Sequence, residues 1–212
     1  MGIRKRLAAM VLVGALAISS AFSVSAATKS PTNANKSYDT KTNQDSNTQD
    51  HVKKTVTAKV NPSKKTATVT KVASTSKKYK TVTLTVARDK NNKAAKITAI
   101  AKNSFASKKG QYIKNVNIKS KASKVTIKTG AFNKSKVQKV AITSKKVAIQ
   151  KNAFKGTKAK SLTLQLKKAS QLKLTKGAFN GLKKITIKGA TKAQKAKIKK
   201  AIQAAGFKGT IK

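Results

Sequence analysis

One short phrase occurs four times in the second half of the chain. It reads ITAIAKNSF up to Phe105, VTIKTGAF up to Phe132, VAIQKNAF up to Phe154 and LKLTKGAF up to Phe179. The Phe-to-Phe spacings of 27, 22 and 25 residues lie within the period of roughly 20 to 29 residues that is typical of leucine-rich repeats. A unit of this size cannot bury its apolar face alone, so the repeat predicts a stack of similar units.

A second phrase lies between or after the Phe residues and has the form LxxLxL with aliphatic exchanges. It reads IKNVNI at 113–118, VQKVAI at 137–142, AKSLTL at 159–164 and LKKITI at 182–187. Its period-two alternation predicts a strand whose first and third aliphatic residues point inward and whose Thr, Asn, Gln and Lys point outward. In the Phe phrase, Gly or Asn precedes a small residue and predicts a left-handed turn. Each unit is expected to have two short strands and one buried Phe.

The segments on either side of the repeats predict caps. Residues 52–87 alternate with period two in three stretches, at 56–60, 67–69 and 82–86, which predicts three short strands that cover the open end of the stack. Near the C-terminus, Ile198, Ala201, Ile202 and Ala205 recur at helical spacing between a capping-box pattern at Thr191 and Gln194 and a stop at Gly206. A cap is the favoured interpretation of this helix; the alternative is a membrane-surface or antimicrobial helix with a lysine-rich polar face.

The N-terminus has the pattern of a secretory signal peptide over residues 1–26. A basic start at Arg4, Lys5 and Arg6 precedes the apolar stretch LAAMVLVGALAI and the exit Val24-Ser25-Ala26. The alternative, a membrane anchor, is disfavoured because a span needs roughly 20 apolar residues. Residues 27–51 are rich in Asn, Thr, Ser and Lys, which predicts a disordered polar linker ending at His51. The chain is therefore expected to be secreted or held non-covalently at a cell surface.

The expected fold is mainly β. It is a short leucine-rich-repeat solenoid of about four units at 97–189, between an N-terminal β-strand cap at 52–96 and a C-terminal helix cap at 190–212. The four repeated Phe residues are assigned to the core of the repeats.

Over about residues 52–212 the chain resembles the BspA-like leucine-rich repeats of bacterial surface proteins. An aliphatic strand, a Gly or Asn turn, Ala-Phe (Ser104-Phe105 in the first copy) and an LxxIxI strand follow one another in all four copies. The family usually has Pro after the LxxIxI strand, where this chain has Lys119, Thr143, Gln165 and Lys188, and often a Cys after Ala-Phe, which is missing here. The resemblance implies an extracellular binding or adhesion scaffold, but no particular ligand.

Positive charge dominates the composition. The formal net charge is +46, and between residues 90 and 212 there are 34 lysines and no acidic residue. Such a field is expected to repel itself, because two unit charges 4 Å apart in water cost about 1 kcal/mol. Lysine is a mobile point charge without the planar fork of arginine, which favours loose binding to polyanions. The competing interpretation is that the lysines serve only solubility and protection of sheet edges.

Eight lysines are the candidate polyanion contacts. The strand residues expected to face outward are Asn117, Ala141, Thr163 and Thr186, flanked by Lys119, Lys139, Lys184 and Lys188. If these strands form a concave face, it is small and polar, and a protein ligand is an alternative occupant. Turns are expected to add a lysine rim, represented by Lys108, Lys109, Lys158 and Lys160.

The residues needed for catalysis or metal binding are scarce. The chain has no Cys or Glu, four Asp and one His, and the repeats contain no acidic residue and no His. General acid–base pairs and clustered metal ligands are therefore not expected, nor is any cofactor. No nucleic-acid-binding motif is present, although non-specific binding to DNA through charge stays open.

The sequence thus predicts an exported, non-catalytic repeat protein that associates electrostatically with an anionic polysaccharide or wall polymer. The polymer is either teichoic acid of the cell wall or a sulfated or sialylated host glycan. Two alternatives come from other classes: a structural surface protein that self-assembles once salt screens its charge, and a membrane-active basic protein that acts through its C-terminal helix.

Overall fold

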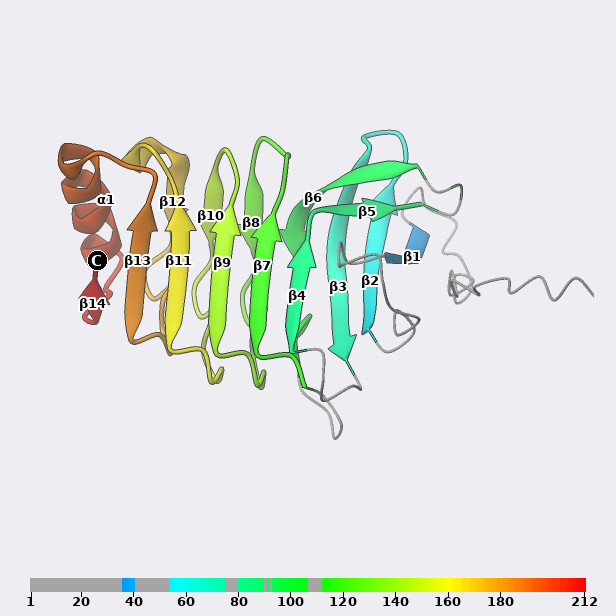
Figure 1. Cartoon of the computed structure of the whole chain (residues 1–212), viewed down its shortest axis with the longest axis horizontal. Coiled ribbons are helices and arrows are strands. Elements are labelled where there is room, and N and C mark those ends of the chain that lie inside the picture. The colour runs from blue at the N-terminus through cyan, green and yellow to red at the C-terminus, as the bar shows by residue number, and fades with distance from the viewer. Residues whose placement is uncertain (1–35, 41–53, 75–79, 90, 92, 107–111) are drawn as a thin grey trace, which may run out of the picture.

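The computed structural model describes residues 36–40, 54–74, 80–89, 91, 93–106 and 112–212. These residues are mainly β, in two sheets built largely of parallel strands, with one short α-helix near the C-terminus (Figure 1). The predicted signal peptide and most of the predicted linker, with His51, lie outside the described residues.

Sheet A contains eight strands. Their order is β1 (Lys36–Thr40), β2 (Lys54–Asn61), β3 (Thr66–Ser74), β6 (Ala94–Ile100), β8 (Val125–Ile127), β10 (Val147–Ile149) and β12 (Leu172–Leu174), with β5 (Val86–Arg88) paired to β6. The pairs β1–β2, β2–β3 and β5–β6 are antiparallel. From β3 to β12 every neighbour along the sheet is parallel.

Sheet B contains six strands, all parallel to their neighbours. Their order is β14 (Thr210–Ile211), β13 (Lys184–Lys188), β11 (Ser161–Gln165), β9 (Lys139–Thr143), β7 (Asn115–Lys119) and β4 (Thr81–Leu84). From β7 to β13 the chain alternates between the sheets, so that each LxxLxL phrase forms a strand of sheet B and each Phe phrase a strand of sheet A. The prediction of two short strands for each copy is confirmed.

The core lies between the sheets and is built from equivalent residues in register. On sheet A, Ile100, Ile127, Ile149 and Leu174 lie side by side; on sheet B, Val116, Val140, Leu162 and Ile185 do the same. All belong to one apolar cluster, or pack against it in the case of Leu174. In the first LxxLxL phrase the middle aliphatic, Val116, is buried as fully as Ile118, because the two residues are two apart on β7.

The four repeated Phe residues are buried in the core, as predicted, and three of them stack on one another. The rings of Phe105 and Phe132 are 4.6 Å apart with 1° between their planes, and those of Phe132 and Phe154 are 5.0 Å apart at 11°. Phe179 instead meets Phe207 edge to face at 5.7 Å. Offset and edge-to-face pairs of this kind add about 0.5 to 1.5 kcal/mol beyond the area they bury.

The turns before the Phe residues are left-handed, as predicted from Gly and Asn. Asn103, Gly130, Asn152 and Gly177 have φ between 57° and 77°. Their amides form a ladder along the molecule: each of the first three donates to the carbonyl of the next, and Gly177 donates to Ala205 at 2.9 Å. The turns are therefore bonded to one another as the strands are.

The N-terminal part differs from the prediction in two places. The expected strand at 82–86 breaks at Thr85, so that β4 joins sheet B beside β7 and β5 joins sheet A. The alternation of buried residues is interrupted at the break: the next buried residue after Leu84 is Ala87, not Val86. In addition, β1 lies inside the predicted linker and pairs with the edge of β2. The predicted linker is thus not wholly without secondary structure.

The C-terminal helix α1 (Lys192–Ala204) begins and ends where its signals predict. The side chain of Thr191 accepts from the amide of Gln194, and Gly206 has φ of 88° just past the end. The amides of Gly206 and Phe207 donate back to the carbonyls of Gln203 and Ile202, the pattern of a Schellman motif. The helix buries Ile198 and Ile202 and lies against β12 and the 3-10 turn η2 (Ala169–Gln171).

Candidate anion-binding surface

The outward face of sheet B carries three rows of side chains set by the strand register. The middle row is Asn117, Ala141, Thr163 and Thr186, all half-buried, as predicted. Side-chain hydrogen bonds across the strands fix parts of this face: Asn117 Nδ2 donates to Thr83 Oγ1 at 3.4 Å, and Thr143 Oγ1 donates to Gln165 Oε1 at 3.2 Å. The middle row of sheet B is therefore an uncharged band of small side chains.

Four of the predicted lysines frame this band. Lys139 and Lys184 lie at the amino ends of β9 and β13, and Lys119 and Lys188 lie at the carboxyl ends of β7 and β13. Neighbouring strands are about 4.8 Å apart, so Lys139 and Lys184, two strands apart, are separated by about 10 Å, and Lys119 and Lys188, three strands apart, by about 14 Å. The strand register thus brings these four residues to the outward face of sheet B, whose strands are labelled in Figure 1.

Lysines on neighbouring strands avoid one another. Among the strand residues that the structure describes, no register pair places two cationic side chains opposite each other; Lys139 faces Asn115 and Ser161, and Lys188 faces Gln165. Like charges directly opposite each other on a sheet are destabilising. Spacings of two strands or more are comparable to the Debye length of about 8 Å at physiological salt, so screening moderates the remaining repulsion.

The structure describes two of the four lysines that were predicted to form a rim. Lys158 and Lys160 are exposed in the segment that leads into β11, and the carbonyl of Lys160 accepts from the amides of Lys183 and Lys184. Lys160 therefore lies at the same edge of sheet B as Lys139 and Lys184. Lys108 and Lys109 lie outside the described residues.

Polar groups in the interior are used by the fold. The buried hydroxyl of Ser120 donates to the carbonyl of Ile97 at 2.7 Å, and that of Ser104 donates to Val69 at 2.9 Å. Every buried side-chain nitrogen or oxygen in the described part of the chain has a hydrogen-bond partner, and no group of three His, Cys, Asp or Glu lies together there.

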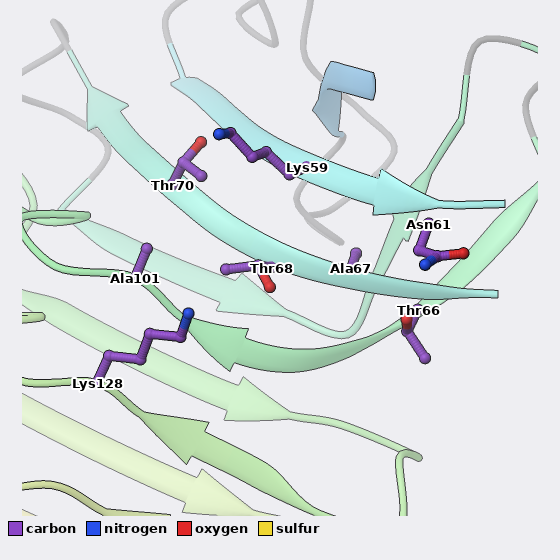
Figure 2. A pocket seen from close by; sticks show the side chains of 8 residues that line it. All are labelled: Lys59, Asn61, Thr66, Ala67, Thr68, Thr70, Ala101 and Lys128. Carbon is purple, nitrogen blue, oxygen red and sulfur yellow. The ribbon is translucent and has the colours of Figure 1, made fainter. Parts of the chain in front are cut away.

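A hollow of about 390 Å³ on the outward face of sheet A was missed by sequence reasoning. Lys59 of β2 and Lys128, just after β8, line it together with Thr66, Thr68 and Thr70 of β3 (Figure 2). The only sequence signal is the stretch TATVT at 66–70, in which Thr alternates with buried Ala67 and Val69. The residues next to Lys59 and Lys128 in the sequence do not predict that either lysine lines a hollow.

Comparison with known proteins found no match to the chain among protein-family models, curated proteins or solved structures. Within the described ranges, the structure has no helix whose length and apolar character would let it cross a membrane.

Proposed function

We propose that the chain is an exported, non-catalytic leucine-rich-repeat solenoid of the BspA-like type that binds anionic polymers through its lysine-rich surface. Its four units would lie between an N-terminal β cap and the helix cap α1. The alternation of strands between two parallel sheets, the left-handed Gly or Asn turns and the Phe stack support this architecture. The polymer class is teichoic acid of the cell wall or a sulfated or sialylated host glycan.

The lysine frame on sheet B carries the proposal. Lys119, Lys139, Lys184 and Lys188 surround an uncharged band on a face that has no acidic side chain. Anionic groups on a polymer that crosses the strands would meet ammonium groups at both ends of the strands and small hydroxyl or amide side chains between them. Because lysine offers a mobile point charge, this surface selects for charge density rather than for one fixed geometry.

Binding of purified teichoic acid and of heparin across a salt series tests the proposal. The quadruple variant Lys119→Gln, Lys139→Gln, Lys184→Gln, Lys188→Gln removes the frame. Its matched control, Lys192→Gln, Lys195→Gln, Lys199→Gln, Lys200→Gln, removes the same charge from exposed positions on α1. Wild-type affinity should fall steeply with salt, and the frame variant should bind more weakly with a shallower salt slope, because fewer counterions are released.

Three outcomes would overturn the proposal. One is absence of binding to both polymers at low salt. Another is an equal loss of affinity in the frame variant and the α1 variant, which would assign binding to net charge alone. A third is association of the chain with itself that rises with salt, which would favour a self-assembling surface protein.

A further inference from the structure

The hollow on sheet A has a local structural cause. The register between β2 and β3 shifts at Thr57/Ala58, and that between β3 and β6 shifts at Ala67/Thr68. Irregularities of this kind bend a strand and increase its twist. They occur beside Lys59 and Thr68, and small Ala101 lines the hollow where β6 has ended. The depression therefore coincides with irregular strand pairing in the backbone.

The walls are cationic and hydroxylic. Figure 2 shows Lys59 reaching toward Thr70 and Lys128 reaching toward Ala101, with Thr68 between the two lysines. None of the eight lining residues is acidic or aromatic. The hydroxyl of Thr70 donates to the carbonyl of Thr57 at 3.1 Å and keeps its lone pairs as acceptors. Among the described residues, the hydroxyls of Thr66 and Thr68 make no hydrogen bond and are open to a ligand.

This combination selects a ligand class. A volume of about 390 Å³ falls near the lower end of the range of about 300 to 1,000 Å³ that is usual for small-molecule sites. Two ammonium groups favour an anion, and charge-assisted hydrogen bonds are roughly twice as strong as neutral ones. Threonine hydroxyls can both donate to and accept from the hydroxyls of a sugar ring.

We propose that this hollow binds a single anionic sugar unit. Lys59 and Lys128 hold its carboxylate, phosphate or sulfate, and Thr66, Thr68 and Thr70 hydrogen-bond its ring hydroxyls. The site lies on sheet A, apart from the lysine frame of sheet B, and is independent of polymer binding there. A chain with both sites can hold a polymer on one face and a sugar unit on the other.

The test is an NMR titration of the exported chain, residues 27–212, at constant ionic strength. The probes are glucuronate, glucose 6-phosphate, inorganic phosphate and, as a neutral control, glucose. Amide shifts should concentrate at 59, 66–70, 101 and 128 for the two anionic sugars. Lys59→Gln with Lys128→Gln should lower affinity for both by about tenfold, whereas the control pair Lys64→Gln with Lys173→Gln, at exposed positions outside the hollow, should change it by less than about twofold.

A hydroxyl variant separates a sugar site from a bare anion site. Thr68→Val keeps the shape of a partly exposed side chain, so the fold should persist. It should weaken binding of glucuronate and glucose 6-phosphate while leaving that of inorganic phosphate unchanged. The inference is overturned if glucose binds as well as the charged sugars, if shifts spread over the lysines generally, or if the control pair loses as much affinity as the hollow pair.

The two proposals fail separately. The hollow variant should keep its affinity for teichoic acid or heparin, and the frame variant should keep its affinity for the anionic sugars. Loss of polymer binding alone would overturn the function proposed for sheet B, and absence of sugar binding alone would overturn the site on sheet A.

Discussion

Asparagine has two roles at the turn residues. Asn103 and Asn152 adopt the left-handed backbone that Gly130 and Gly177 adopt in the other copies. Their side chains then accept hydrogen bonds from asparagines of the next copy: Asn133 Nδ2 donates to Asn103 Oδ1 at 3.4 Å, and Asn180 Nδ2 donates to Asn152 Oδ1 at 2.8 Å. Asn thus tolerates positive φ and links neighbouring turns, whereas Gly offers only the first property.

Substitutions at Asn152 should separate these two roles. Asn152→Gly keeps the backbone and loses the side-chain bond, so we expect it to cost about 1 kcal/mol or less. Asn152→Ala loses the bond and also places a Cβ at φ of 57°, which should add about 1 to 2 kcal/mol. Urea unfolding of the wild type and both variants measures the difference; equal costs for Gly and Ala would show that backbone conformation is not what selects Asn here.

Among the elements, those defined by the repeated phrases were predictable and those at the N-terminus were less so. The phrases fix a strand and its inward face wherever aliphatic residues recur two apart, as Val140 and Ile142 do on β9. The stretch VTLTVA reads as one alternating strand, yet it divides at Thr85. Its division depends on which strands are free to pair: β4 pairs with β7, which lies much later in the chain, whereas β5 pairs with β6, the next strand. The pairing of β4 is long-range and leaves no local pattern.

Helix α1 gives a further test at the scale of one element. Its apolar residues Ile198 and Ile202 are fully buried, so the folded chain presents mainly the lysine face. We therefore expect the folded chain to cause no leakage from vesicles of anionic lipid, because insertion needs an exposed apolar face. Dye release is the measurement, and the isolated peptide 190–212 serves as the comparison. Leakage by the folded chain would favour the membrane-active alternative.

At the scale of the whole molecule, positive charge opposes compaction. The lysines of neighbouring strands are offset, but no acidic residue follows position 90 to compensate them. Raising salt from 10 mM to 1 M shortens the Debye length from about 30 to 3 Å, which should weaken this repulsion more in the compact state than in the expanded one.

We therefore expect the thermal midpoint of unfolding to rise over this range by about 4 °C or more, which for a domain of this size corresponds to roughly 1 to 2 kcal/mol. Circular dichroism in NaCl is the measurement. The α1 quadruple glutamine variant is the control and should gain less from salt. A midpoint that is independent of salt in both proteins would show that the offset of the strand lysines already removes the repulsion.

The two candidate sites differ in how much of each could be predicted. The sheet B frame follows from strand periodicity, because Lys184 and Lys188 are the two end residues of one predicted strand, and the same alternation places Lys119 and Lys139 at the ends of β7 and β9. The hollow joins Lys59 and Lys128, which are far apart in the sequence and meet only because β2, β3, β6 and β8 are consecutive in sheet A. Its depth also depends on two register shifts that no residue pattern announces.

The bond from the Gly177 amide to the Ala205 carbonyl bears on how such a chain can grow. A copy of residues 133–154 inserted in the middle would find the same left-handed turn and the same kind of ring stack on both of its sides. A copy added beyond Phe179 would separate Gly177 from its partner on the helix and Phe179 from Phe207. We therefore expect that the chain can be lengthened by duplicating a repeat in its interior, but not by adding a repeat next to the C-terminal helix.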